Sequence, residues 1–186
     1  MILDVFMNEY MVKGSSIKSK FDFVKAVFKE EKFAKLKNEL PAYNNITLLD
    51  TSWYPFQMYE DVNKKIADIC YGGEISKLQE VGSFSAEQVL TSVYKSYMSG
   101  GDFLKFLKRI SSLHERFYSA GKMEVIVDQN EKACKIVLSG APFYTEADNN
   151  IALGFYVGSA NLCGLKKVKG TITKKIKQVV FDLIWS

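Results

Sequence analysis

The chain of 186 residues contains few of the residue types that usually mark a catalytic or metal site. It has one histidine, His114, and three cysteines, Cys70, Cys134 and Cys163. The cysteines are odd in number and far apart, so they form neither a disulfide framework nor a paired zinc-ligand motif. This usage excludes a disulfide-rich secreted scaffold, argues against a zinc enzyme and favours a reducing, cytoplasmic setting.

Motifs that carry catalysis are also lacking. There is no GxxxxGK[ST] phosphate loop, no GxGxxG after a strand and no GxSxG nucleophile turn. A nucleophile triad would need His114 as its base, and no serine or cysteine lies in a recognisable nucleophile motif. We therefore expect a protein that is not an enzyme.

No long hydrophobic run marks a membrane span or a signal peptide. The first segment, "MILDVFMNEYMVKGSS", is acidic where a signal peptide is basic, and its apolar run is short and interrupted. Residues 1–10 are read as an N-terminal arm: a short strand, an ordered arm or a misplaced start. We expect no membrane span.

The charge balance excludes little by itself. A net charge of +4 comes from 25 basic and 21 acidic residues, which is weak support for a nucleic-acid partner. Six lysines in "KKVKGTITKKIK", residues 166–177, alternate with Val168, Ile172 and Ile176. This alternation favours strands with one solvated face, or edges protected by lysine, over a nucleic-acid patch. We expect no nucleic-acid partner.

Helical periodicity dominates the first half of the chain. Ile17, Phe21, Val24 and Phe28 recur at helical spacing after Ser15 or Ser16, which can cap a helix start. Further helices are predicted over 30–40, ending before Pro41, over 53–70 with Pro55 in the first turn, over 74–98 and over 102–118.

Beyond Gly121 the period changes to that of strands. Strands are predicted over 122–128 and 132–140, joined by a turn, then a helix over 146–163 and two strands over 165–173 and 175–185. The fold class is therefore α+β: a helical N-terminal half followed by an antiparallel sheet with a packed helix. We expect a single domain over 11–186.

His114 lies on an apolar helical stripe with Phe103, Leu107, Ile110 and Phe117, so it should point inward. Burial keeps an imidazole neutral, and the neutral form is the one that binds a metal. The pattern is typical of a hydrogen-bonded core histidine and is compatible with a metal ligand.

The run "FLKRISSLHERFYSAGKM", residues 106–123, resembles the helix of haem-nitric-oxide/oxygen-binding (H-NOX) domains that carries the proximal haem histidine, with His114 at the ligand position. Residues 19–36 and 52–82 and the closing "FDLIW" are also similar to H-NOX segments. The resemblance implies an H-NOX-like fold. H-NOX domains hold the haem propionates with a Tyr-x-Ser-x-Arg motif, whereas here the corresponding region keeps Ser139 and has no arginine. The chain's two arginines, Arg109 and Arg116, lie on the predicted helix that carries His114.

A second resemblance concerns "KGSS" (13–16), "TSWYPF" (51–56), "VGSFSAEQVLTSVYKSYM" (81–98) and "ERFYSAGKMEV" (115–125). These stretches are similar to those of a bacterial, myxobacterial-type set of paralogous proteins. In that set an aromatic residue commonly stands at the position of His114. The set looks like part of the broader superfamily that includes H-NOX and four-vinyl-reductase-like ligand domains.

The leading hypothesis is a non-enzymatic, intracellular ligand-binding or signalling domain with an apolar pocket. The pocket is expected between the His114 helix, the helix of "WYPFQMY" and the C-terminal sheet, with these candidate residues: His114, Phe117, Tyr118, Met58, Phe84, Tyr97 and Phe143. One alternative is a haem-based NO or O2 sensor with His114 as the axial iron ligand, and another is a dimerisation or scaffold module. The corresponding partners are a small apolar ligand or haem, and a second copy or a signalling protein.

Overall fold

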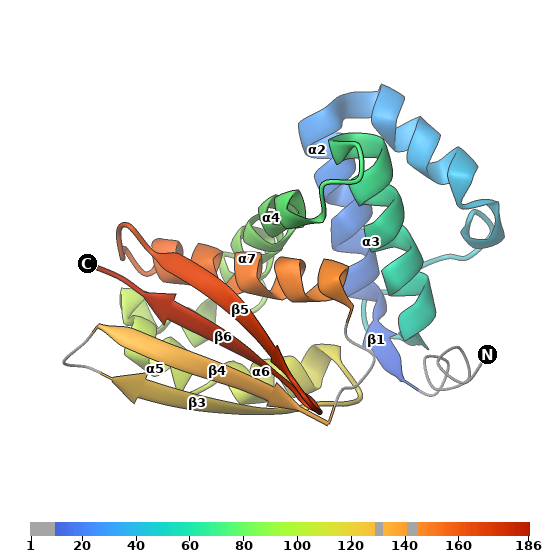
Figure 1. Ribbon diagram of the computed structural model, residues 1–186. Helices are drawn as coiled ribbons and strands as arrows, with labels where there is room; N and C mark the ends of the chain where they lie inside the picture. The colour runs from blue at the N-terminus through green and yellow to red at the C-terminus, as the bar shows by residue number, and fades with distance from the viewer. Residues whose placement is uncertain (1–9, 129–131, 141–144) are drawn as a thin grey trace.

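Helices make up the first part of the chain and an antiparallel sheet most of the last part, as the computed structural model in Figure 1 shows. The structure describes residues 10–128, 132–140 and 145–186. The first part contains β1 (Met11–Lys13), α2 (Gly14–Glu39), η1 (Pro41–Tyr43), β2 (Trp53–Pro55), α3 (Phe56–Tyr71), η2 (Ile75–Lys77), α4 (Leu78–Leu90), η3 (Lys95–Gly101), α5 (Phe103–Leu107) and α6 (Ile110–Phe117). The second contains β3 (Lys122–Asp128), β4 (Ala133–Ser139), α7 (Glu146–Leu162), β5 (Lys169–Lys175) and β6 (Gln178–Ile184). This order confirms the predicted α+β class.

The four-stranded sheet has the order β3-β4-β6-β5, and every neighbouring pair is antiparallel. Alternate residues point to one buried face, where Ile136 pairs with Phe181 and Leu138 with Val179. Helices cover this face: α7 packs on β5 and β6, and α6 packs on β3. The Tyr156 ring of α7 meets the Phe181 ring edge-on at 5.1 Å. The sheet and its helices thus form one side of the core.

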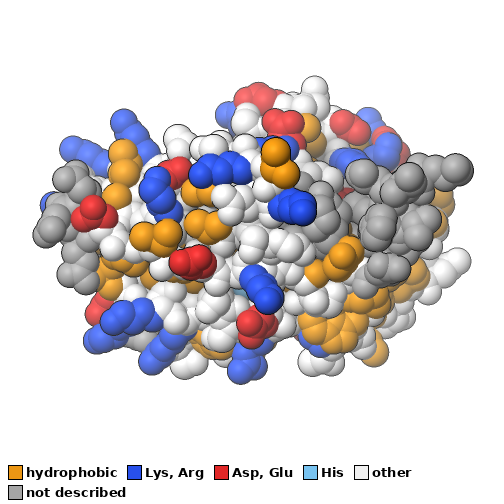
Figure 2. All heavy atoms as spheres, turned by 60° about the horizontal axis from the view of Figure 1, so that its bottom comes forward, with side chains coloured by type: hydrophobic (Ala, Val, Ile, Leu, Met, Phe, Trp, Pro, Cys, Tyr) orange, Lys and Arg blue, Asp and Glu red, His pale blue; other side chains and the backbone are white. Residues whose placement is uncertain are grey.

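The strand β5 forms one edge of this sheet, as the lysine-rich pattern indicated. Lys169, Lys174 and Lys175 are exposed along it. On the face of the molecule drawn in Figure 2, basic side chains are interspersed with acidic ones. The exposed lysines along β5 are typical of an edge strand, because their charges disfavour pairing with a strand of another chain.

The two predicted helices before Pro41 form one assigned helix, α2, with a sharp change of direction that Figure 1 shows near its middle. Lys29 has φ 64° and ψ −171°, a backbone conformation that residues with a side chain rarely adopt. The break therefore lies where the two sequence patterns meet.

The prediction that Ser15 or Ser16 caps α2 was wrong. The helix begins at Gly14, and the amides of Gly14 and Ser15 donate to the carbonyls of Ser52 and Asp50 instead. Both serines therefore lie within the first turn of α2. Backbone carbonyls from a segment distant in sequence, and not a serine hydroxyl, accept hydrogen bonds from the amides at the start of this helix.

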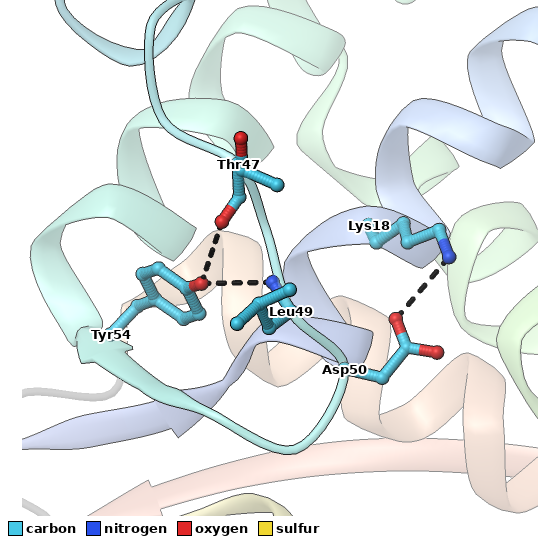
Figure 3. Close-up of polar contacts among 5 residues, drawn as sticks. All are labelled: Lys18, Thr47, Leu49, Asp50 and Tyr54. Atoms are coloured by element: carbon cyan, nitrogen blue, oxygen red, sulfur yellow. Dashed lines mark hydrogen bonds and ion pairs between the residues drawn. The ribbon is translucent and has the colours of Figure 1, made fainter.

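This capping segment is held by Tyr54, as Figure 3 shows. The Tyr54 hydroxyl accepts from the Leu49 amide at 2.9 Å and donates to the Thr47 carbonyl at 3.0 Å. A Cβ atom at Gly14 would lie 2.3 Å from the Leu49 carbonyl oxygen and 2.7 Å from the Tyr54 ring. The "KGSS" and "WYP" motifs thus form one structural unit that sets the position of the first turn of α2.

The helices α4 and α7 approach so closely that only glycine fits at their crossing. A Cβ atom on Gly82 would lie 2.0 Å from the Ile151 carbonyl oxygen, and one on Gly154 would lie 2.0 Å from that of Gln79. The Ser83 hydroxyl donates to the Gly154 carbonyl at 3.0 Å. This contact fixes α7 against the helical part of the fold.

Two helices differ from their predicted lengths: one ends before its predicted last residue, and the other is divided into two. The helix predicted over 74–98 has its regular part in α4, which ends at Leu90, where the hydroxyls of Thr91 and Ser92 donate to carbonyls four residues back. Such bonds compete with continuation of the helix. The helix predicted over 102–118 is divided into α5 and α6, because the Arg109 amide donates three residues back, to Phe106.

Cys70, Cys134 and Cys163 are free thiols. In the part of the chain that the structure describes, no helix has the length and apolar character needed to cross a membrane. Of the predicted N-terminal arm, residues 1–9 lie outside the described residues, and Met11 begins β1.

Candidate functional site

A cavity of about 90 Å³ lies between the first turns of α2 and the helices α4, α6 and α7. One part of its wall is apolar and is formed mainly by Val89, Ile110, Leu113, Phe117, Met123, Leu138, Ile151 and Phe155. The other part is polar and is formed by Ser15, Ser16, Ser19, Lys20, Ser85 and Asp148. His114 and three tyrosines, Tyr59, Tyr118 and Tyr156, complete the lining. Apolar walls with a few converging polar groups are typical of a small-molecule site.

Lys20 is the most unusual residue of the polar wall, because it is a buried cation with 3% of its surface exposed. Its ammonium donates to Ser85 Oγ at 3.1 Å and to Ser19 Oγ at 3.4 Å. Both hydroxyls donate in turn to backbone carbonyls, so they act as acceptors for the lysine. Among the described residues no carboxylate lies within ion-pair distance of Lys20.

Burial lowers the pKa of Lys20 to about 8, and the charge of Asp148 partly opposes this decrease. The Lys20 ammonium is therefore still largely protonated at neutral pH. It also lies 5.3 Å from the centre of the Tyr59 ring, within the range of a cation–π contact. Two neutral hydroxyls and one ring are weak compensation for the water that a buried ammonium loses.

Asp148 supplies the opposite charge on the same cavity. It lies in the first turn of α7 with 3% of its surface exposed, and its Oδ1 atom has no hydrogen-bond partner among the described residues. Burial raises the pKa of Asp148 to about 7, while a hydrogen bond with Tyr59 and the charge of Lys20 lower it. A carboxyl that is partly ionised at neutral pH thus lines the cavity.

Glu60 of α3 lies behind Asp148, outside the cavity lining, and is fully buried. Its Oε2 atom accepts a hydrogen bond from the Thr145 hydroxyl. Burial and then the charge of Asp148 raise the pKa of Glu60 to about 8. Two buried carboxyls next to each other disfavour simultaneous ionisation, so this end of the site holds a proton at neutral pH.

Two buried tyrosines, Tyr59 of α3 and Tyr118 directly after α6, contact each other in this site. The Tyr118 hydroxyl donates to the Tyr59 hydroxyl at 3.3 Å, and their rings meet edge-on at 6.2 Å. Burial raises the pKa of both tyrosines well above the ordinary value, so both hydroxyls remain protonated. They are hydrogen-bonding groups in this site.

His114 lines the cavity from α6 and is 8% exposed. Its Nε2 atom lies 3.0 Å from the Ala120 carbonyl oxygen, and its ring stacks on the Tyr118 ring at 4.9 Å. Burial lowers the pKa of His114, so the ring is neutral near pH 7. Because a carbonyl can only accept, Nε2 carries the hydrogen and has no lone pair for a metal in this arrangement.

The structure brings together three of the seven predicted pocket residues: His114, Phe117 and Tyr118 line the cavity. Phe84 packs edge-on against Phe23 at 5.4 Å and does not line it. Met58 is buried in the core outside this cavity, and the Tyr97 hydroxyl accepts from Arg116 Nε at 3.0 Å near the surface. Phe143 lies outside the described residues.

The sequence reading missed the charged residues of the site, Lys20 and Asp148. A signal exists for the first: Lys20 stands three residues after Ile17 and four before Val24, on the buried stripe of α2. Asp148 likewise stands three residues before the buried Ile151. A charged residue at a position that periodicity assigns to the core indicates a candidate functional site.

No group of three or more His, Cys, Asp or Glu residues within the described ranges could hold a metal ion. The two arginines lie at the surface, where Arg109 Nη1 donates to the Ser96 carbonyl and Arg116 Nε to the Tyr97 hydroxyl. Neither lines the cavity. The positive charge in the cavity therefore comes from Lys20.

No family model matches the chain, and no curated relative matches it. Solved structures of H-NOX proteins do match. An H-NOX protein from S. oneidensis in the Fe(II)NO ligation state is 12% identical, with 94% of this chain and 99% of that chain covered at a TM-score of 0.74. A mutant of H-NOX from T. tengcongensis is 11% identical, with 94% and 97% covered at a TM-score of 0.72. The chain therefore has an H-NOX-like fold, as the sequence resemblance implied.

The residues of this chain do not fit a haem. Pockets for drug-sized ligands begin at roughly 300 Å³, and this cavity of about 90 Å³ is far smaller. His114 Nε2 is hydrogen-bonded to the Ala120 carbonyl and so is not presented to an iron. The polar wall also places a buried lysine and a carboxyl in the cavity, where a haem would need apolar surface. The absence of arginine from the cavity lining agrees with the missing Tyr-x-Ser-x-Arg motif.

Proposed function

We propose that the protein is a non-enzymatic ligand-binding domain that senses a small molecule in the cavity described above. The observation that carries the proposal is the pair of buried, oppositely charged groups, Lys20 and Asp148, on one cavity without an ion pair between them. Unpaired buried charges destabilise a fold, so their presence in one cavity is best explained by a ligand that contacts them. The apolar wall would take the remainder of the ligand.

We place the protein in the cytoplasm, supported by three free thiols, and within the bacterial paralogous set whose motifs it resembles. A second copy or a signalling protein would read out the bound state. Because the cavity is formed by α2, α4, α6 and α7, a ligand that changes their packing would change the surface that such a partner contacts.

Thermal unfolding with a panel of small metabolites tests the proposal. The panel contains carboxylates, amines, amino acids and neutral polar molecules, and a ligand of the folded state raises the unfolding temperature by mass action. We expect at least one member to stabilise the wild-type protein and not an Ala152→Phe variant, whose ring fills the cavity from α7. If no member acts, and the protein is a ligand-free dimer by light scattering, a structural dimerisation module is the better description.

A further inference from the structure

Resting on the proposed function, we propose that the cavity binds a small α-amino acid as its zwitterion. The carboxylate would contact Lys20 and the serines of α2, the ammonium would contact Asp148, and the side chain would face the apolar wall. Three observations carry the proposal: a cation with hydrogen-bonding capacity left, an anion with an unpartnered oxygen, and a volume that admits only very small molecules.

The cation end is formed by the first two turns of α2. Ser16, Ser19 and Lys20 stand at positions i, i+3 and i+4, so they share one face of the helix, and this face lines the cavity. The Lys20 ammonium has three N–H groups, and the structure pairs two of them, with Ser19 and Ser85. The N-terminal turns of a helix also carry partial positive charge. A carboxylate would supply the charge partner that Lys20 lacks.

The anion end lies at the first turn of α7. Asp148 lines a cavity that also holds a cation, and its buried Oδ1 atom has no partner among the described residues. A buried acceptor without a donor destabilises the fold unless a ligand or water donates to it. An ammonium supplies several N–H donors and the opposite charge, so it satisfies this oxygen and neutralises Asp148.

Charge balance favours a zwitterion over a molecule with one charge. A simple carboxylate would place a second negative charge in the cavity beside Asp148, and a simple amine would place a second positive charge beside Lys20. Either would bring an uncompensated charge into a buried site, which is unfavourable. A zwitterion gives each buried group a partner and leaves the net charge of the cavity unchanged.

The volume limits the side chain of the ligand. A cavity of about 150 Å³ admits benzene, whereas this one has about 90 Å³. Glycine and alanine are therefore the expected ligands. A branched amino acid such as valine would need outward movement of the apolar wall, which includes Val89 and Phe117.

Isothermal titration calorimetry at pH 7.5 with matched probes tests the proposal. The probes are glycine, alanine and valine, with propionate and ethylamine as the two halves of alanine. We expect alanine or glycine to bind at least tenfold more tightly than propionate and ethylamine, and valine to bind more weakly than alanine. Equal binding of propionate and alanine, or of ethylamine and alanine, would overturn the zwitterion.

Two variants with matched controls locate the contacts. Lys20→Met and Asp148→Asn each remove one charge and should weaken alanine binding at least tenfold. Lys18→Met on an exposed side of α2 and Glu146→Gln in the first turn of α7 should leave it within twofold. The probe comparison on wild-type protein remains decisive if a variant fails to fold.

The outcomes also separate this inference from the proposed function. If other members of the metabolite panel bind in the cavity and no amino acid does, the zwitterion is wrong while the ligand-binding function stands. If neither amino acids nor any panel member bind, both are wrong.

Discussion

The Nε2 atom of His114 lies 3.0 Å from the carbonyl oxygen of Ala120, six residues further along the chain. This hydrogen bond joins α6 to the turn at Gly121, whose φ of 92° favours glycine. It gives the single histidine of the chain a structural partner at the edge of the cavity. The histidine is thus part of the cavity wall through its packing and its hydrogen bond.

The first prediction concerns haem. Because Nε2 is hydrogen-bonded and the cavity is small, purified protein titrated with haem should show no Soret band of an axially ligated iron, and His114→Ala should give the same spectrum. Absorption spectroscopy with equimolar haem measures this directly. A strong Soret band in the wild type that disappears in His114→Ala would restore the haem-sensor alternative.

A second prediction concerns the crossing of α4 and α7. Gly154→Ala and Gly82→Ala each place a Cβ atom about 2.0 Å from a backbone carbonyl oxygen, so the helices must move apart. We expect each to lower the free energy of unfolding by at least ~2 kcal/mol, as overpacking of a core contact does. Urea unfolding monitored by circular dichroism measures this.

The exposed residues Gln88 and Asn161 of the same two helices provide matched controls. Gln88→Ala and Asn161→Ala should change the free energy of unfolding by less than ~0.5 kcal/mol. If Gly154→Ala is as stable as these controls, the close approach of the two helices is not as the structure has it.

The sequence predicted the fold class and most element positions, because apolar periodicity reports burial directly. The strands around Ile136 and Phe181 and the helix over 146–163 follow from this pattern alone. The break between α5 and α6 does not, since it depends on Arg109 donating its amide three residues back and its side chain to Ser96. Such competition between local and distant hydrogen bonds leaves no periodic trace.

The site was predictable only in its apolar half. All three predicted residues that line the cavity come from one stretch of chain: His114 and Phe117 lie on α6, whose inward face the spacing reveals, and Tyr118 is the residue that follows this helix. Lys20 and Asp148 were missed because charged residues are ordinarily assigned to solvent, and their burial depends on helices distant in sequence meeting in space. Which distant residues share a cavity is a property of tertiary packing.

A third prediction tests the break within α2. Lys29 adopts φ 64° and ψ −171°, a region populated almost entirely by glycine. Lys29→Gly should therefore raise the free energy of unfolding by ~1 kcal/mol, whereas Glu30→Gly, one residue later in helical backbone, should lower it by about the same amount. Chemical denaturation of both variants measures the difference. A destabilised Lys29→Gly would show that the break does not strain the lysine backbone.

The fourth prediction follows from the buried carboxyls. Burial raises the pKa of Glu60 to about 8 in the folded state, above its ordinary value of 4.5. Between these pH values the folded state keeps a proton that the unfolded state has lost. The contribution of this group to the free energy of unfolding is therefore fully present below pH 4.5 and is lost as the pH rises to 8.

The variant Glu60→Gln cannot ionise, and its amide oxygen can still accept from Thr145. Between pH 5 and pH 8 we expect the free energy of unfolding to decrease less in this variant than in the wild type, by on the order of 2 kcal/mol. The decrease that persists in the variant would arise from Asp148, whose pKa burial also raises. Urea unfolding at pH 5, 6, 7 and 8 measures it, with the exposed Glu31→Gln as a control that should follow the wild type. Parallel curves for Glu60→Gln and wild type would mean that Glu60 ionises in the folded protein as it does in the unfolded chain, and that the proton held beside Asp148 is absent.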